Sequence, residues 1–363
     1  MTSIDVIIIG LGVHGSACAR ELASCGLRVV GVDALASGVV GGASRGPARM
    51  FRVMHDKREL VPLALESMRL WEELARSGRR PLYRPARRIL IGPADQPELA
   101  EVGRAGTRLA RDDTTLARLA LPSDWVAFAD DDAGLLDAPA CVLSLREAAT
   151  VAGAKLLFGA RASLPDAPPG PSPVRVRVGP RELSADLALI CVGAGMVQLP
   201  AWAQPPGLRI EPAHMHVARF AADPVPLGAD AFYIIHGESG PFCTIPLGTR
   251  QGVQFGHFSP PPGAAGLSVR EASAVTWRRD LEALRRYLPG LGRIRQRRTV
   301  RAAYTMSADG SFVLRWVAPR VATLSACSGI GFKFAPALAK RVVAALIGTG
   351  GTQDALRVEG ARS

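Results

Sequence analysis

The 363-residue sequence contains no uninterrupted apolar run of about 18 residues, so we expect no transmembrane helix. None of its six cysteines forms a CxxC pair, which favours buried, reduced thiols over a metal site. Aromatic residues make up 6% of the chain and the arginines are spread along it, so the net charge of +12 does not indicate a nucleic-acid partner. The start "MTSIDVIIIGLG" lacks the basic segment of a signal peptide, and we expect a cytoplasmic protein.

Lysine is scarce as well, because only four of the 44 basic residues are lysine. One of them, Lys333, lies between two phenylalanines in "CSGIGFKFAP" (327–336), after a glycine-rich turn and before a predicted helix. A solvated surface cation does not need such neighbours, although a lysine at a helix start can also extend its ammonium group to water. Burying an ammonium group is costly unless an anion binds it, so the segment suggests an anion-binding site.

The N-terminal segment has the pattern of a Rossmann-type dinucleotide site. An apolar strand predicted over 5–9 is followed by Gly10, Gly12 and Gly15, then by an apolar helical stripe and a second strand that ends in Asp33. The glycines allow a tight turn, close approach of a pyrophosphate and close helix–strand packing, and the helix N-terminus attracts the phosphates. Asp33 is spaced to accept hydrogen bonds from a ribose. The motif does not separate NAD from FAD, but the acid disfavours NADP.

Further along the chain, similar segments enclose strand-rich regions. We predict a helix over 60–76, a buried strand over 187–192 that leads into Gly193-Ala194-Gly195, strands over 312–316 and 321–326, and a final helix over 336–347. This order indicates an α/β plus α+β fold: a discontinuous, Rossmann-like cofactor-binding domain and a sheet-rich substrate domain. We expect the first over 1–80, 140–205 and 300–363, and the second over 81–139 and 206–299.

Three charged or histidine-containing segments have simple interpretations. "RIRQRRTVR" (293–301) alternates with apolar residues and indicates an exposed strand edge. The run Asp130–Asp132 has no calcium-binding pattern and is expected to form a solvated loop. His214 and His216 lie on one face of a predicted strand, but no carboxylate or cysteine stands at useful spacing, so we expect them to line a pocket and to bind no metal.

Several blocks, in the same order and spacing nearly end to end, resemble the FAD-dependent amine oxidases of the monomeric sarcosine oxidase and N-methyltryptophan oxidase group, within the D-amino-acid oxidase superfamily. They include "GLGVHGSACARELASCGLRVVGVDA", "GGASRGPARMFR", "LICVGAGMVQLPAW", "AAYTMSADGSFVL" and "CSGIGFKFAP". The resemblance implies bound FAD, a small amine or amino-acid substrate, transfer of a hydride to flavin N5 with an imine as product, and a monomer.

The resemblance also implies roles for individual residues. Arg52 and Lys333 match the family positions that bind a substrate carboxylate over the flavin, and Arg49 is expected to shape the flavin's surroundings. The turn Gly329–Gly331 is expected to place N–H groups near the flavin edge that becomes negative on reduction. The expected cofactor-binding residues are Gly10, Gly12, Val13, His14, Gly15, Asp33, Ala34, Ser44, Arg45, Arg49, Gly193, Ala194, Gly329, Ile330, Gly331, Phe332 and Lys333.

The sequence departs from the family pattern at catalytically important positions. Ala302 in "RAAYTM" replaces the cysteine that links covalent flavin, so we predict non-covalent FAD, with Cys327 as a conceivable alternative link. Gln254 in "GVQFGHF" replaces the lysine that promotes the reaction with oxygen, and a neutral amide cannot stabilise developing superoxide as an ammonium group does. His257 in the same stretch either contacts the substrate or is a packed strand histidine.

Three functions remain open from the sequence. The leading prediction is oxidation of an amino acid or cyclic imino acid. The first alternative is a flavin dehydrogenase or tailoring enzyme with weak oxygen reactivity, and the second is a flavin-binding subunit that needs a partner protein.

Overall fold

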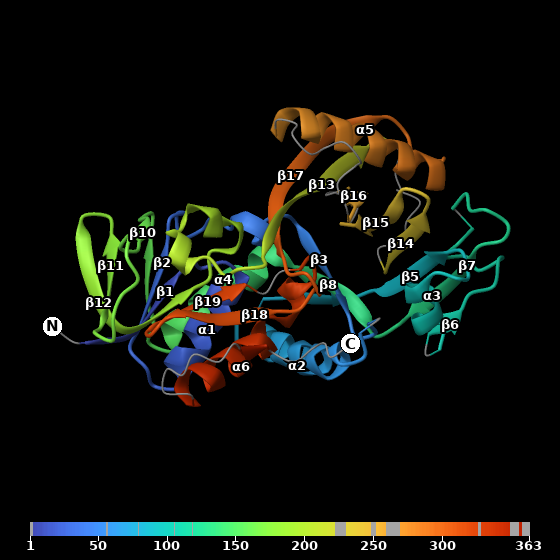
Figure 1. Ribbon diagram of the computed structural model, residues 1–363. Helices are drawn as coiled ribbons and strands as arrows, with labels where there is room; N and C mark the ends of the chain where they lie inside the picture. Colours follow the sequence, from blue (N-terminus) through green and yellow to red (C-terminus); the bar gives the residue numbers. More distant parts are fainter. Residues whose placement is uncertain are drawn as a thin grey trace.

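The computed structural model describes residues 3–348 and 356–357, except 56, 79, 105, 118, 222–229, 248–251, 259–268 and 326–327. Its strands form a nine-stranded, an eight-stranded and a three-stranded sheet. Figure 1 shows the nine-stranded sheet with most of the helices in one part of the molecule and the eight-stranded sheet in another. The predicted combination of a Rossmann-like part with a sheet-rich part is confirmed.

The nine-stranded sheet has a parallel centre, in which β1 (Ile4–Ile9) pairs with β2 (Val29–Asp33) on one side and with β12 (Arg181–Ile190) on the other. Its main strand order is β20-β18-β19-β12-β1-β2-β9. The remaining strands are β9 (Lys155–Phe158), β10 (Ala162–Ser163), β11 (Val174–Val178), β18 (Val313–Ala318), β19 (Val321–Ser325) and β20 (Leu356–Arg357).

Both faces of this sheet are covered, because alternate side chains of a strand point to opposite faces. Val6 and Ile8 lie on one face and pack with the apolar sides of four helices. Ile7 and Ile9 lie on the other face and pack in one cluster with apolar residues of β11. The continuous apolar run of β1 is typical of a strand buried on both faces. The four helices are α1 (Val13–Ser24), α2 (Leu60–Gly78), α4 (Ala138–Val151) and α6 (Ala335–Gly348).

The eight-stranded sheet has the order β17-β13-β16-β15-β14-β5-β7-β6. Figure 1 shows its two long strands, β13 and β17, running from the nine-stranded sheet to α5 (Val269–Tyr287), which packs over them. The strands are β5 (Arg87–Gly92), β6 (Thr107–Arg108), β7 (Val126–Asp130), β13 (Arg209–Phe220), β14 (Ala231–Gly237), β15 (Gly240–Pro246), β16 (Val253–His257) and β17 (Ile294–Met306).

A third sheet, β3-β8-β4, packs against the face of the eight-stranded sheet that α5 does not cover. It consists of β3 (Ala48–Arg52), β4 (Tyr83–Pro85) and β8 (Ala133–Asp137), and helix α3 (Pro97–Val102) adds to the same apolar cluster. Short 3-10 helices cover Gly42–Ser44, Gly193–Gln198, Ala201–Ala203 and Gly331–Phe334.

Two expectations for charged segments have different outcomes. Strand β17 contains the arginine-rich run and lies at the end of its sheet with most of these arginines exposed, so the predicted strand edge is confirmed. The expectation of a solvated loop is wrong for Asp130, which ends β7, is 1% exposed and lies 3.1 Å from the guanidinium of Arg88. A cation on a strand 42 residues earlier stabilises the buried carboxyl, and nothing in the local sequence shows that contact.

None of the helices in the described part of the chain is both long and apolar enough to cross a membrane. The strands of the nine-stranded sheet come from residues 4–33, 155–190 and 313–357, and those of the eight-stranded sheet from 87–130, 209–257 and 294–306. The domain limits given by the sequence stay a prediction.

Candidate active site

The glycine loop between β1 and α1 has a shape that larger residues would disturb. Gly10 has a φ of +93°, and a Cβ atom there would lie 2.7 Å from the carbonyl oxygen of Cys191. A Cβ atom on Gly15 would overlap the carbonyl oxygen of Gly10. Both glycines therefore allow α1 to begin directly against the strand ends, with its N–H groups directed at the loop.

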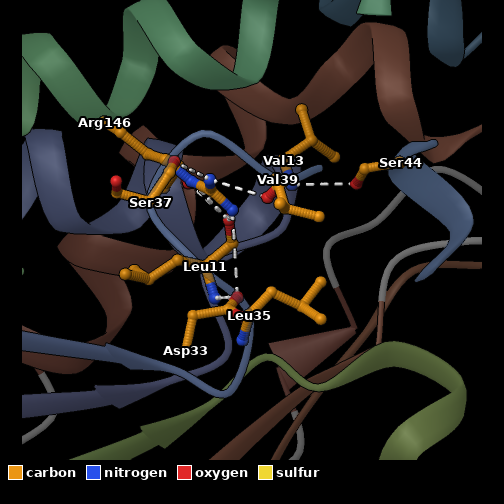
Figure 2. A network of polar contacts seen from close by, with 9 residues as sticks. Leu11, Val13, Asp33, Leu35, Ser37, Val39, Ser44 and Arg146 are labelled. Carbon is orange, nitrogen blue, oxygen red and sulfur yellow. Dashed lines mark hydrogen bonds and ion pairs between the residues drawn. The ribbon is translucent and has the colours of Figure 1, made fainter. Parts of the chain in front are cut away.

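Side chains from later in the chain fix this loop (Figure 2). Asp33, at the end of β2, accepts hydrogen bonds from the backbone N–H groups of Leu11 and Leu35, at 2.8 and 2.9 Å. The hydroxyl of Ser44 accepts from the N–H of Val13 at 3.1 Å, in the first turn of α1. Asp33 thus shapes the loop, and each carboxylate oxygen can still accept a second hydrogen bond, as from a ribose.

Arg146 on α4 is a loop contact that the sequence did not reveal. Its guanidinium donates to the carbonyl oxygen of Leu11 at 2.8 and 3.1 Å and to those of Ser37 and Val39 at 2.8 and 3.0 Å. It also lies over the ring of Phe158 at 5.0 Å. The side chain therefore connects the glycine loop to the segment after β2. The only indication in the sequence is that Arg146 interrupts the apolar stripe of a predicted helix. An arginine at such a position normally lies at the edge of the stripe, with its charge in solvent.

These elements surround a cavity of about 340 Å³. A cavity with a glycine loop and a helix N-terminus at its wall fits a dinucleotide such as FAD. Gly15 lies behind the loop, Arg45 is exposed and contacts the carbonyl oxygen of Arg301, and Ala194 is not among the lining residues. The predicted cofactor residues that line it are Gly10, Gly12, Val13, His14, Asp33, Ala34, Ser44, Arg49, Gly193, Gly329, Gly331 and Phe332.

We expect Arg146→Leu to weaken FAD binding, because the change leaves three loop carbonyl groups without their donor. The Kd for FAD should rise by roughly 10-fold or more, which corresponds to about 1.4 kcal/mol. The measurement is fluorescence titration of the apoprotein with FAD. Glu147→Gln, an exposed change on the same helix, is the control and should leave the Kd unaltered. Equal affinity of the Arg146→Leu variant and the parent would contradict this role.

A second cavity of about 320 Å³ adjoins the first, and the two share Arg49, Tyr304, Gly329 and Phe332 in their walls. The structure brings all four residues predicted to be catalytic into the lining of this second cavity: Arg52, Gln254, His257 and Lys333. Ile330 also lines this cavity rather than the dinucleotide cavity. A small molecule bound in the second cavity would lie beside the region that the two cavities share.

Lys333 is buried in the wall of the second cavity, with 5% of its surface exposed. Its ammonium group donates to the carbonyl oxygen of Ile330 at 3.3 Å and lies 4.8 Å from the ring centre of Phe334. The indole N–H of Trp71 donates to the backbone carbonyl of Lys333 at 2.9 Å and fixes the short helix that carries it. A lysine extended to solvent is thereby excluded.

Arg52 lies in the same wall but has a protein partner that the sequence did not reveal. Its guanidinium forms an ion pair with Glu98 on α3. Glu98 also lies 3.1 Å from Arg88 and 3.3 Å from His236. Burial alone would raise the pKa of Glu98, but the hydrogen bond from His236 and the charges of Arg52 and Arg88 hold it well below its ordinary range. Glu98 is therefore a carboxylate.

Within the described residues, the polar cluster around Arg52 has more positive than negative groups. Arg52, Arg88 and Lys333 are three cations, and Glu98 and Asp130 supply two carboxyl groups. His55 beside them is neutral, because burial and the charges of Lys333, Arg52 and Arg88 lower its pKa far below the ordinary value. Burial raises the pKa of the Asp130 carboxyl although Arg88 lies beside it, so the cations outweigh the carboxylates. An added anion offsets this positive charge, and this suits a carboxylate ligand.

Gln254 is 3% exposed and lines the second cavity. Its amide nitrogen lies 3.5 Å from the carbonyl oxygen of Ala48 and 3.7 Å from the sulfur of Met215. Ala302 on β17 pairs with Ala213 on β13, close to Tyr304 in the wall between the two cavities. Cys327 lies outside the described residues.

The two histidines of β13 differ in their surroundings. His214 lines the second cavity, as predicted. The prediction that His216 lines a pocket is wrong, because its ring is fully buried between Phe255 and Trp277, with Nδ1 3.0 Å from the hydroxyl of Thr299. Among the described residues no group of three histidine, cysteine or carboxylate side chains is arranged to hold a metal ion.

The cavity that fits a dinucleotide adjoins a cavity lined by the cationic side chains of Arg52 and Lys333, an arrangement that suits an oxidoreductase with a bound flavin. The chain belongs to the FAD dependent oxidoreductase family (DAO), whose profile matches residues 5–345.

The chain is also similar to individual proteins. N-methyl-L-tryptophan oxidase of Salmonella heidelberg (strain SL476) is 26% identical over 352 residues, which cover 92% of each chain. Monomeric sarcosine oxidase of Bacillus sp. (strain B-0618) is 28% identical over 204 residues, which cover 53% of this chain and about half (52%) of that protein. A structure of a NikD variant, described as an unusual amino acid oxidase essential for nikkomycin biosynthesis, superposes with a TM-score of 0.80 at 21% identity over 100% of both chains and shows the shared fold.

Proposed function

We propose that the protein oxidises the C–N bond of an amino acid or cyclic imino acid. The observation that supports this most strongly is that the buried Lys333 and the partly buried Arg52 line one cavity, beside the cavity that fits the dinucleotide. FAD, when bound, supplies the acceptor for the hydride that leaves the carbon bearing nitrogen. The substrate then becomes an imine, which is released or hydrolysed.

In this proposal the chain's own residues bind and orient the substrate. The planar guanidinium of Arg52 and the point-like ammonium of Lys333 hold the substrate carboxylate from two directions. Glu98 offsets part of the positive charge of Arg52 and Arg88, so that the substrate carboxylate meets the remainder. Orientation of the reacting carbon supplies most of the rate enhancement.

We further propose that FAD is bound without a covalent link, because Ala302 has no thiol to form one. Acid precipitation of the purified holoprotein should release the yellow colour to the supernatant, as measured by its visible spectrum. The matched variant is Ala302→Cys. It restores the cysteine that the family pattern has at this position, so that a covalent link to the flavin can form. Colour that stays in the pellet of the parent protein would contradict the proposal and direct attention to Cys327.

A second candidate function, a flavin dehydrogenase that uses an acceptor other than oxygen, is favoured by the neutral Gln254 in the cavity wall. Turnover with oxygen and turnover with an artificial electron acceptor separate these two possibilities. A protein inert with both would correspond to the third possibility, a flavin-binding subunit that needs a partner.

The proposed function is tested by anaerobic mixing of the holoprotein with a panel of carboxylated amines: sarcosine, N-methyl-L-tryptophan and L-proline. We expect at least one of them to bleach the flavin absorbance, and its methyl ester to do so more slowly, because the ester lacks the anion for Arg52 and Lys333. A panel that leaves the spectrum unchanged, with FAD bound, would overturn the proposal.

A further inference from the structure

The carboxylate of Asp280 on α5 is buried against three nitrogen-bearing side chains, with 1% of its surface exposed. Nδ1 of His257 lies 2.7 Å from Oδ1 of Asp280, and Nε of Arg279 donates to the same oxygen at 2.8 Å. Nε2 of His216 lies 3.2 Å from the other oxygen. Burial alone would raise the pKa of Asp280, but these three neighbours hold it well below its ordinary range, so the group is a carboxylate.

Packing around His216 fixes the position of this carboxylate. The ring of His216 meets the ring of Trp277 edge-on, with 5.1 Å between the ring centres, and its centre lies 5.5 Å from that of Phe255. Its Nδ1 is 3.0 Å from the hydroxyl of Thr299 on β17. Asp280 is thus held from two strands and its own helix. A buried carboxylate fixed in this way can orient a histidine ring rather than follow it.

His257 connects the Asp280 cluster to the second cavity, which is the substrate cavity of the proposed function. Together with His214 and Phe258 it lines both the substrate cavity and a small cavity of about 10 Å³, whose other walls include Asp280. That volume is close to the space for one water molecule. The neighbouring Gly256 allows the close packing, because a Cβ atom there would lie 3.2 Å from Oδ2 of Asp280 and 3.1 Å from the carbonyl oxygen of His214.

We propose that His257 accepts the proton of the substrate's ammonium group before oxidation, and that Asp280 is the positioning residue that holds the imidazole for this step. This inference rests on the proposed amine oxidation.

The tautomer of His257 determines which nitrogen accepts the proton. In a neutral imidazole one nitrogen carries the hydrogen and the other a lone pair, so a carboxylate at Nδ1 directs the lone pair to Nε2. One N–H bond of the substrate breaks and one N–H bond forms at Nε2. The freed nitrogen lone pair can then assist departure of the hydride.

The other bases of the cavity suit this step less well. Glu98 has its pKa held far below the ordinary range by His236, Arg52 and Arg88, so it is a weak proton acceptor at neutral pH. Burial and the neighbouring His216 lower the pKa of His214, Arg301 and Arg279 act in the same direction, and Asp280 offsets only part of this lowering. His257, in contrast, has a carboxylate at 2.7 Å that stabilises the imidazolium formed on protonation.

Other charged and titratable groups near His257 come from every element that packs there. Helix α5 provides Asp280 and Arg279, whose charges offset one another, and β13 provides His214 and His216. The ring of Phe242 on β15 lies 5.1 Å from that of His257, and burial raises the pKa of the adjacent Cys243 to about 12, so the thiol stays neutral.

The remaining charged and titratable groups lie further along the cavity wall. Arg301 on β17 lies near His214. The others that line the cavity are Arg49, Arg52, Glu98, Glu211, Tyr304 and Lys333.

The test is the pH dependence of anaerobic flavin reduction by the fastest amine of the panel, in the parent protein and in His257→Gln. The parent's limiting rate should rise with pH below the amine's own pKa, because only the neutral imidazole can accept the proton. His257→Gln should be slower by about 10²-fold at pH 7, the usual effect of general base catalysis. The difference in rate between His257→Gln and the parent should vanish above the amine's own pKa, because the substrate is then already neutral and needs no base. A variant that is slow because its structure is damaged would not recover in this way.

Asp280→Asn provides a second variant in which the imidazole remains. It should lose about 10-fold at pH 7 and should also recover at high pH, because the imidazolium has lost its stabilising charge but Nε2 is still present. His214→Gln, a histidine of the same cavity wall, is the control and should keep the shape of the parent's pH profile whatever its rate.

The outcomes separate this inference from the function on which it rests. A parent protein whose flavin no amine reduces overturns both. If an amine reduces the flavin, a parent rate that does not change with pH below the amine's own pKa overturns the inference alone, even when neither variant folds. A His257→Gln deficit that persists unchanged above the amine's own pKa does so as well.

Discussion

Lys333→Met and Arg52→Ala are each expected to weaken the binding of a carboxylate inhibitor by about 2–3 kcal/mol, or roughly 30- to 140-fold in Kd, with FAD still bound. Each change removes a charge-assisted hydrogen bond in a buried cavity, where water replaces it poorly. Benzoate is a suitable probe, and its binding is measured from the perturbation of the flavin spectrum. Turnover of carboxylated amines should fall at least as much.

Two variants make this experiment specific. Lys340→Met removes an exposed lysine from α6, close in sequence to Lys333, and should leave benzoate binding unaltered. Glu98→Gln should strengthen benzoate binding, because it removes the protein carboxylate that is paired with Arg52. Unchanged affinity in both Lys333→Met and Arg52→Ala would show that the carboxylate binds elsewhere.

Gln254→Lys is expected to accelerate the reaction of the reduced flavin with oxygen by about 10²-fold, the order of effect that one preorganised electrostatic group supplies. Oxygen gains negative charge as it is reduced, and an ammonium group in the wall of this cavity would stabilise that charge where the present amide cannot. The rate is measured by mixing photoreduced protein with oxygenated buffer, so no substrate is needed.

The control for this prediction keeps the size of the side chain without its charge. Gln254→Met should react with oxygen at the rate of the parent protein. Because Gln254 is 3% exposed, the new lysine must remain in the cavity to act, and retention of FAD by the variant verifies that the site is intact. Equal oxidation rates for the lysine and methionine variants would contradict the electrostatic explanation.

The parts of the fold that the sequence predicted are those with local physical causes. The strand, glycines and helix around Gly10 and Gly15 follow from backbone geometry within some thirty residues, and the resemblance of short blocks placed Arg52 and Lys333 in one site. The two cavities share Arg49 and Phe332, so these blocks do meet in space.

Contacts between side chains far apart in the chain could not be predicted in the same way. Glu98 meets Arg52 across 46 residues, Asp280 meets His216 across 64, and Arg146 meets Leu11 across 135. Each partner lies in an ordinary amphipathic segment, where a charged residue normally faces solvent. The solvated loop predicted for Asp130 is wrong for the same reason, since Arg88 stabilises it from another strand.

The central claim, oxidation of a C–N bond beside the flavin, is tested most directly by identifying the product of one anaerobic turnover. The holoprotein is mixed with an amino acid that bleaches it and, separately, with the corresponding 2-hydroxy acid, which carries the same carboxylate without the nitrogen. The account predicts one equivalent of imine, or of the carbonyl compound and amine formed by its hydrolysis, for each flavin reduced, and no bleaching by the hydroxy acid. Bleaching by the hydroxy acid, or bleaching by the amino acid without a product of C–N oxidation, would contradict it.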